Sequence, residues 1–336
     1  MVSARGTLNS IVILLATQSA LGHHSPIAFN EEAVINVEGT VTRFDFRNPH
    51  VYFYMESTDD AGNSVEWEME SDWTTELRRL GWTEDSLQPG DRITVEAHPA
   101  RNPQRHYANL IKLEKEDGTV LTSWDLRPEE EPPPPAQTSS IAGRWLPARD
   151  FPRYFGLTGR LANDKGRAAQ QSFDESQNPG AECIPHPIPQ RLGNPHVNDI
   201  EVFDDRVVIT AETESASRII YLDGRTYPEN TEPTWRGHSV GRWDGEVLVV
   251  ETTQFAPHRS GNGRGLPSGV QKRLTERYRL DEDGARMFVD FVLEDPEYLT
   301  EPLADTFVWT YAPHMELIPF SCDPNIARRY LEGVLN

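Results

Sequence analysis

Four consecutive prolines, Pro132 to Pro135, stand near the middle of this chain and constrain its fold more than any other feature. They lie in an acidic, proline-rich and small-polar stretch, 127–140, in which no apolar periodicity remains. Because consecutive prolines favour an extended and stiff backbone, this stretch predicts a spacer between two separately folded units. A length of 336 residues also fits two domains. We therefore predict domains over 23–126 and 141–336.

The first 22 residues have the pattern of a secretory signal peptide. Arg5 precedes an apolar run over 11–16, and the small-residue sequence at 20–22 fits a cleavage site. The apolar run is shorter than the roughly 20 residues that a membrane-spanning helix needs, and no later segment approaches that length. The pattern predicts an exported protein, periplasmic or secreted, with no membrane span and with His23 as its first residue after cleavage.

The charge of the chain limits its partners. The formal net charge is −21, and it becomes −22 without residues 1–22, where Arg5 is the only charged side chain. Such an acidic chain is disfavoured as a partner of nucleic acid or of an anionic lipid surface. The sequence also contains no dinucleotide fingerprint, P-loop or nucleophile elbow, so no organic cofactor is expected. The oligomeric state stays unknown.

The two cysteines, Cys183 and Cys322, are both expected to meet an oxidising compartment after export. A disulfide between them is the leading prediction. The alternative, a free thiol nucleophile, lacks a local motif. Proline spacing after Cys183 projects His186 from a rigid segment, and we predict that His186 frames the mouth of a ligand pocket.

The first domain has the element order of a small OB-like barrel. Apolar and polar residues alternate in three strands, a short helix follows, and two more strands complete the domain, over 34–46, 51–57, 64–70, 72–80, 92–97 and 107–113. Three strands, a helix and two strands is the order of the five-stranded Greek-key barrel. An open sandwich would show the same order of elements.

The second domain is also mostly β. Alternating segments separated by Asp-rich or Asp-Gly turns predict strands over 200–203, 206–212, 218–222, 239–243, 247–253, 274–280, 287–294 and 306–311. Consecutive hairpins favour an antiparallel meander, and closure into a barrel removes its edges. We predict an antiparallel lipocalin-like barrel with an internal cavity, with a β-sandwich as the alternative.

The mature N-terminus is a candidate metal site. His23 would offer an α-amine and an imidazole to one ion, with His24 beside it. Nitrogen ligands of this kind suit copper. Pro49 holds the preceding residue extended and sets His50 at the edge of a strand, so His50 is the predicted third ligand, with His98 and His106 as further candidates. The alternative is a solvated terminal tail without metal.

Several motifs of the first domain occur together and carry a resemblance. They are the mature His-His-Ser start, Gly39-Thr40-Val41, Asn48-Pro49-His50, Arg79-Leu80-Gly81-Trp82 and Pro89-Gly90-Asp91. In this combination, residues 23–122 resemble a family of exported bacterial proteins whose function is not established. The resemblance implies a small periplasmic β domain and nothing about catalysis. The second domain resembles the C-terminal part of other uncharacterised exported proteins through residues 233–245 and 294–298.

The densest candidate region of the second domain is 235–245. Alternation places His238, Val240 and Arg242 on one face of a strand, and we predict that this face lines the barrel interior. His238 would then act as an acid/base or ligand-orienting group beside a carboxylate, chosen from Glu251, Glu276, Asp290 and Glu294. The predicted ligand-binding residues are Trp235, Arg236, Arg242, Trp243 and His186. The alternative is a structural histidine bonded to a neighbouring turn.

Three functions follow as hypotheses. The first is an envelope protein that binds a small, partly apolar molecule in the second barrel, with a metal site in the first domain. The second is a lyase, isomerase or hydrolase that uses His238 and a carboxylate in the same cavity. The third is a structural or partner-binding protein. Whether a reaction is catalysed stays open at this point.

Overall fold

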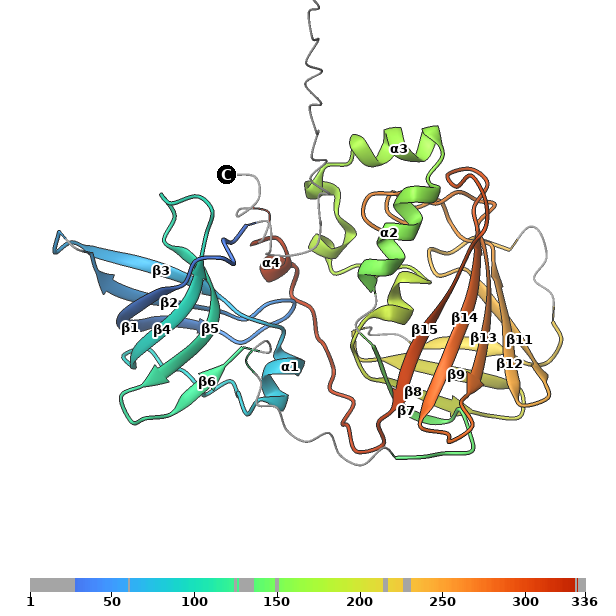
Figure 1. The fold of residues 1–336 in the computed structure, drawn as a ribbon, viewed down its shortest axis with the longest axis horizontal. Coiled ribbons are helices and arrows are strands. Elements are labelled where there is room, and N and C mark those ends of the chain that lie inside the picture. Colours follow the sequence, from blue (N-terminus) through green and yellow to red (C-terminus); the bar gives the residue numbers. More distant parts are fainter. Residues whose placement is uncertain are drawn as a thin grey trace, which may run out of the picture.

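The computed structural model describes residues 28–59, 61–123, 126, 136–148, 151–213, 217–225, 231–329 and 331. Two β-barrels make up this part of the chain, which confirms the predicted mostly β fold. Figure 1 shows the smaller N-terminal barrel on the left, the larger C-terminal barrel on the right, and the C-terminal segment between them. The predicted signal peptide and residues 127–135 of the predicted spacer lie outside the described residues. Within the described ranges, no helix has the length and apolar character needed to cross a membrane.

The N-terminal barrel consists of β1 (Ile35–Asp45), β2 (Tyr52–Thr58), β3 (Ser64–Glu70), β4 (Arg92–Pro99) and β5 (Tyr107–Lys115), with a short β6 (Val120–Thr122) beside β5. Its strand order is β3-β2-β1-β4-β5-β6, and a parallel pairing of β3 with β5 closes five strands into a barrel. Helix α1 (Thr74–Arg79) lies between β3 and β4 in the chain. The predicted OB-like barrel is therefore confirmed.

Alternation along the strands produces the core of this barrel. On β4, Ile93, Val95 and Ala97 are buried while the residues between them are more exposed. Opposite Glu96 and Ala97, β5 has one extra residue, Ile111, and a bulge of this kind increases the local twist that helps a small barrel to close. The inward side chains of β4 join one continuous apolar cluster with those of the other strands.

The C-terminal barrel is a closed ring of nine strands in chain order: β7 (Gly143–Pro147), β8 (Asn198–Val202), β9 (Arg206–Ala211), β10 (Arg218–Tyr221), β11 (His238–Asp244), β12 (Val247–Thr253), β13 (Arg273–Leu280), β14 (Arg286–Glu294) and β15 (Leu303–Tyr311). Pairing of β15 with β7 closes the ring. A closed ring with an odd number of strands cannot alternate in direction throughout, so one pair must be parallel, and that pair is β10 with β11. The predicted closed barrel is confirmed, the β-sandwich alternative is wrong, and the purely antiparallel order is wrong at this pair.

A helical insertion between β7 and β8, which the sequence analysis did not predict, covers one end of this barrel (Figure 1). It contains α2 (Phe151–Leu161), α3 (Asp164–Gln171) and the 3-10 turns η2 (Glu175–Gln177), η3 (Pro179–Glu182) and η4 (Gln190–Gly193). Tyr154 and Leu192 of the insertion are buried in the core of the barrel. The indole of Trp309 on β15 donates a hydrogen bond to the Leu192 carbonyl at 2.8 Å. The insertion and the strands therefore share one core.

Large side chains occupy the interior of the C-terminal barrel. Trp145, Tyr278 and Trp309 are each 0% exposed. Phe291 and Phe307 stack with ring centroids 5.3 Å apart. These buried rings occupy much of the interior that the sequence analysis assigned to a ligand.

After β15 the chain crosses to the N-terminal barrel, and we call residues 313–329 the C-terminal tail. Cys322 of this tail forms a disulfide with Cys183, with 5.8 Å between the Cα atoms, which confirms the predicted bond. Helix α4 (Pro324–Ala327) follows, and its Ile326 packs with Phe29, Tyr52 and Tyr107 of the N-terminal barrel. The end of the predicted second domain is therefore part of the surface of the first.

Candidate functional site

His238 lies on the outer face of β11, so the prediction that it faces the barrel interior is wrong. Its neighbour Ser239 is the buried residue, and His238 Nε2 lies 3.0 Å from the carbonyl oxygen of Glu232. The alternation was assigned correctly, but the inward face was not. A Cβ at Gly241 would lie 2.8 Å from Ile220 Cγ2, so the face with Ser239 and Gly241 packs against the neighbouring strand.

The carboxylates predicted to assist His238 do not converge on it. Glu251 is exposed on β12, opposite Val240. Glu276 is 0% exposed inside the barrel, on the other side of the strand layer from His238. Asp290 accepts hydrogen bonds from Arg279 Nε at 2.7 Å and from the Thr306 hydroxyl at 2.6 Å. The structure therefore does not assemble the predicted acid/base pair.

Glu276 instead belongs to a buried polar network in the barrel. Both of its carboxylate oxygens accept hydrogen bonds from the Arg218 guanidinium, at 2.8 and 2.5 Å. Arg218 also donates to Ser239 Oγ at 3.1 Å and to Thr252 Oγ1 at 2.8 Å, and Tyr278 OH donates to Glu276 Oε1 at 2.8 Å. Each member of the network is partnered by another, so the arrangement suits a rigid barrel core.

The predicted ligand-binding residues are also dispersed. Arg236 stacks over Trp235 at 4.9 Å, and Arg242 is exposed on β11. His186 lies in the helical insertion with its Nδ1 3.0 Å from Gln190 Nε2. Burial, together with the neighbouring His196, lowers the pKa of His186 to about 4. Of the predicted ligand-binding residues, only Trp243 lines a cleft at the end of the C-terminal barrel opposite the helical insertion. We call this cleft the mouth cleft.

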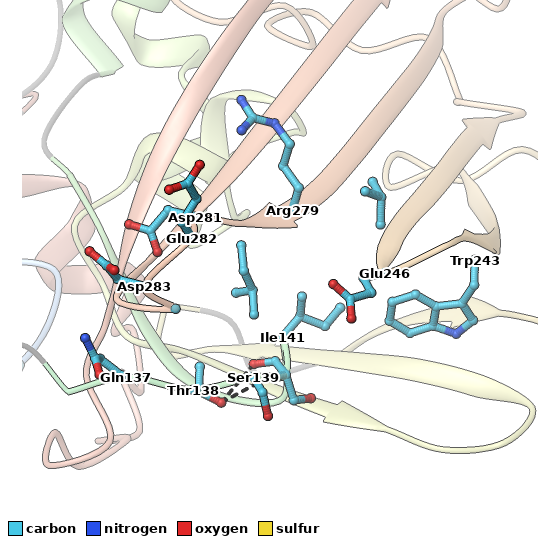
Figure 2. A pocket seen from close by; sticks show the side chains of 14 residues that line it. Gln137, Thr138, Ser139, Ile141, Trp243, Glu246, Arg279, Asp281, Glu282 and Asp283 are labelled. Atoms are coloured by element: carbon cyan, nitrogen blue, oxygen red, sulfur yellow. Dashed lines mark hydrogen bonds between the residues drawn. The ribbon is translucent and has the colours of Figure 1, made fainter.

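The mouth cleft has a volume of about 760 Å³ and lies between the hairpin turns of the C-terminal barrel and residues 137–141. Figure 2 shows Trp243 and Glu246 at one end of the cleft, Asp281, Glu282 and Asp283 at the other, and Ile141 between them. The cleft therefore combines an aromatic ring, apolar side chains and several carboxylates.

The second candidate site is built around the Asn48-Pro49-His50 motif in the N-terminal barrel. Asn48 is 3% exposed and accepts a hydrogen bond from the Thr74 amide at 2.8 Å, at the start of α1. Its side-chain amide donates to the Phe320 carbonyl of the C-terminal tail. Asn48 thus connects α1, the C-terminal tail and the start of β2. These contacts fix the loop that carries His50.

His50 is oriented by a buried carboxylate. Its Nδ1 lies 3.0 Å from Glu70 Oε1 and 3.1 Å from the Ser71 carbonyl oxygen. The Glu70 carboxylate is 2% exposed and also accepts hydrogen bonds from the hydroxyls of Tyr52, at 3.1 Å, and Tyr107. We call Tyr52, Glu70, Tyr107 and His50 the His50 cluster. It places one imidazole against one carboxylate that two tyrosines hold in position.

The electrostatics of the His50 cluster follow from this geometry. Burial by itself would lower the pKa of His50, but the Glu70 carboxylate and the Ser71 carbonyl raise it above its ordinary value. Burial by itself would raise the pKa of Glu70, but His50 and the two tyrosine hydroxyls lower it. Burial and the Glu70 charge raise the pKa of Tyr107 well above its ordinary range. Glu70 is therefore the fixed negative charge of the cluster.

The other predicted metal ligands are placed differently. His98 Nδ1 lies 2.8 Å from the Ala33 carbonyl oxygen, and the His106 ring packs on Trp67 with centroids 5.1 Å apart. His23 and His24 lie outside the described residues. Among the residues that are described, no three His, Cys, Asp or Glu side chains form a group that could hold a metal ion. A metal site at His50 would therefore need ligands from outside the described residues.

Lys272 is a buried amine that the sequence analysis missed. The residue is 1% exposed, and its Nζ donates to the carbonyls of Ile188 at 2.8 Å and Gly261 at 2.6 Å. Burial lowers the pKa of this amine to about 7, although Asp295 acts in the opposite direction. The two carbonyls are 84 and 11 residues away in the chain, so no local motif could indicate them.

Lys272 should make the stability of the fold depend on pH. The unfolded amine keeps a pKa of 10.5 and the folded one about 7, so between these values the unfolded state binds more protons. Stability should therefore increase from pH 7 towards 10.5 and be lost as pH falls back through that range, with a slope of up to about 1.4 kcal/mol per pH unit. Urea unfolding of the wild type and Lys272→Met at pH 7, 8 and 9 isolates this slope. A difference between the two proteins that stays constant with pH would contradict it.

Comparison with known proteins covers only the N-terminal part of the chain. No curated protein matches the sequence. Residues 11–109 match the profile of a family of unknown function, DUF6152, and this range includes the Asn48-Pro49-His50 motif and Glu70. Most of the N-terminal barrel, with all four residues of its His50 cluster, is therefore similar to a family of unknown function.

Proposed function

We propose that this chain is an exported, periplasmic or secreted protein whose N-terminal barrel binds a copper ion through His50, His23 and His24. One observation carries the proposal: the buried Glu70 carboxylate lies 3.0 Å from Nδ1 of His50. Metal-binding histidines commonly donate one ring N–H to a carboxylate or carbonyl, which fixes the ring and increases the basicity of the other nitrogen. His50 has both kinds of partner at Nδ1, so Nε2 is the nitrogen that would bind the metal.

The length of the chain before the barrel supports this ligand set. Phe29 pairs with Ala100 and packs against Tyr107 with ring centroids 4.8 Å apart, and Tyr107 donates to Glu70. The start of the described chain is therefore anchored on the wall that carries the His50 cluster. His24 precedes Ala28 by four residues, which span about 14 Å at most. Imidazole and amine nitrogens are ligands that copper prefers.

The proposal is tested by titrating the signal-cleaved protein, beginning at His23, with Cu(II) against a competing chelator. His50→Ala should weaken copper binding by about 100-fold or more, because it removes a ligand. Glu70→Gln should weaken binding by about 10- to 100-fold, the effect typical of a lost outer-shell carboxylate. One extra glycine before His23 should also weaken binding, because it moves the α-amine away from the imidazole.

His106→Ala is the matched control, since His106 is an exposed histidine of the same barrel. Its copper affinity should equal that of the wild type. Circular dichroism of every variant checks that the barrel remains folded. If His50→Ala binds copper as tightly as the wild type, the ion is held by the terminal residues alone and the proposed site is wrong.

For the C-terminal barrel we retain the proposal that it binds a small, partly apolar molecule, at the mouth cleft instead of the interior. The filled core and the paired Arg218 and Glu276 leave the cleft as the better candidate. Its volume of about 760 Å³ lies within the range of small-molecule sites in proteins. Saturable binding of a small molecule that Trp243→Ala weakens would support this function.

A further inference from the structure

The mouth cleft presents an exposed aromatic ring above apolar side chains. Trp243 is 42% exposed and is the next-to-last residue of β11, with Asp244 between it and the turn into β12. Ile141, Val247 and Leu280 also line the cleft. Large aromatic side chains are normally buried, so an indole exposed beside a concave surface is a candidate contact for a ligand.

The charge of the cleft is strongly one-sided. Arg279 is the one basic side chain among the described residues that line the cleft, and it pairs with Asp290 at 2.7 Å and stacks over Phe288 at 4.4 Å. Asp281 is paired with Arg286 at 3.0 Å and accepts hydrogen bonds from the amides of Ala285 and Arg286. In each pair the positive and the negative charge cancel. The remaining carboxylates therefore determine the electrostatic potential of the cleft.

Those remaining carboxylates are Glu246, Glu282 and Asp283. Within the described part of the chain, none of the three forms an ion pair, and all are exposed. Figure 2 shows Glu246 beside the indole of Trp243 and the other two at the opposite end of the cleft. A ligand in the cleft would therefore meet negative charge at both ends and an apolar surface between them.

We propose that the mouth cleft binds an organic cation, a molecule with an ammonium group on an apolar or aromatic body. This inference rests on the proposal that the cleft is a small-molecule site, and it names the ligand class. The face of an indole attracts a cation through the ring quadrupole, and nearby carboxylates add Coulombic attraction. Anions are repelled by the same groups. A neutral apolar molecule would gain only the contact with the ring and the apolar side chains.

The test uses benzyltrimethylammonium chloride as the probe, with benzyl alcohol and sodium benzoate as neutral and anionic molecules that carry the same ring. Isothermal titration calorimetry of the full mature chain should give an affinity for the cation at least about 10-fold above that for the alcohol, with no measurable binding of benzoate. Because the carboxylates are exposed, raising NaCl from 0.05 to 0.5 M should weaken cation binding and leave alcohol binding unchanged.

Two variants assign the binding to the cleft. Trp243→Ala should reduce affinity for the cation at least about 5-fold, whereas Phe203→Ala, which truncates another exposed aromatic residue, should not. The triple change Glu246→Gln, Glu282→Gln and Asp283→Asn should remove the preference for the cation, whereas Asp204→Asn in a different turn should retain it.

The outcomes separate the ligand class from the binding function. Equal affinity for the cation and the alcohol, lost in Trp243→Ala, would overturn the cation inference and retain the cleft as a small-molecule site. Cation binding that Trp243→Ala does not change would place the ion elsewhere and overturn the inference. Absence of binding by all three probes would overturn both.

Discussion

Replacing Cys183 and Cys322 by alanine should lower the free energy of unfolding by up to about 5 kcal/mol. The disulfide joins residues 139 apart in the sequence, and a cross-link over so long a loop removes much of the conformational freedom of the unfolded chain. Urea unfolding of the oxidised wild type, of the wild type with dithiothreitol and of the double variant measures the effect. The reduced wild type and the double variant should unfold at the same, lower urea concentration.

The same change should loosen the C-terminal tail from the N-terminal barrel. The tail contacts Asn48 through the Asp323 amide, which donates to the Asn48 carbonyl at 2.9 Å, and through the Phe320 carbonyl. It also forms ion pairs between Arg47 and Asp323 at 2.9 Å and between Arg329 and Asp45 at 2.9 Å. These contacts are individually modest, so without the disulfide the tail should be cut faster by trypsin at Arg328 or Arg329. Unchanged urea midpoints and cleavage rates after reduction would contradict this role.

Glu276→Ala should destabilise the C-terminal barrel by about 3–5 kcal/mol, because it leaves the Arg218 guanidinium buried without its carboxylate. Arg218 is 5% exposed and Glu276 0%, so the pair lies away from bulk water. Ser239, Thr252 and Tyr278 would also lose the geometry of their shared network. Urea unfolding followed by tryptophan fluorescence measures the loss, since Trp145 and Trp309 lie in the same core.

A double variant separates two contributions to the free energy of unfolding: the penalty for an unpaired buried charge and the net stabilisation by the ion pair. Arg218→Met combined with Glu276→Leu removes both charges and should be less destabilised than Glu276→Ala alone. The exposed pair of Arg277 with Asp244, at 3.1 Å, provides the control, and Asp244→Ala should cost less than about 1 kcal/mol. If Glu276→Ala is no more harmful than Asp244→Ala, the network does not stabilise the barrel as described.

The His50 cluster illustrates how far a motif can be interpreted. Asn48-Pro49-His50 indicated a presented histidine, because proline restricts the residue before it. Glu70, which orients that histidine, comes from the end of β3, and Tyr107 comes from β5. Neither partner could be selected from the sequence, since several acidic and tyrosine residues of the same domain were equally available.

The His238 region shows the opposite result. The strand, the turn and the alternation of side chains were all predicted. The prediction nevertheless put His238 on the inward face, whereas Ser239 is the buried residue. A strand has two faces, and the pattern of one strand does not say which of them meets the core when both carry an apolar or small residue. Here Gly241 allows Ile220 and Leu248 to pack closely, which turns Ser239 inward and His238 outward.

The sequence alone determined local features: the positions of most strands and turns of both barrels, and the pairing of Cys183 with Cys322. Each of these depends on short-range alternation, turn chemistry or a count of two thiols. Tertiary structure alone decided that nine strands close with one parallel pair, that a helical insertion shares the core, and that the tail packs on the first barrel. It also buried Glu70 against His50, Glu276 against Arg218 and Lys272 under two carbonyls. The physical reason is that these partners meet only through burial, and burial depends on every strand that surrounds them.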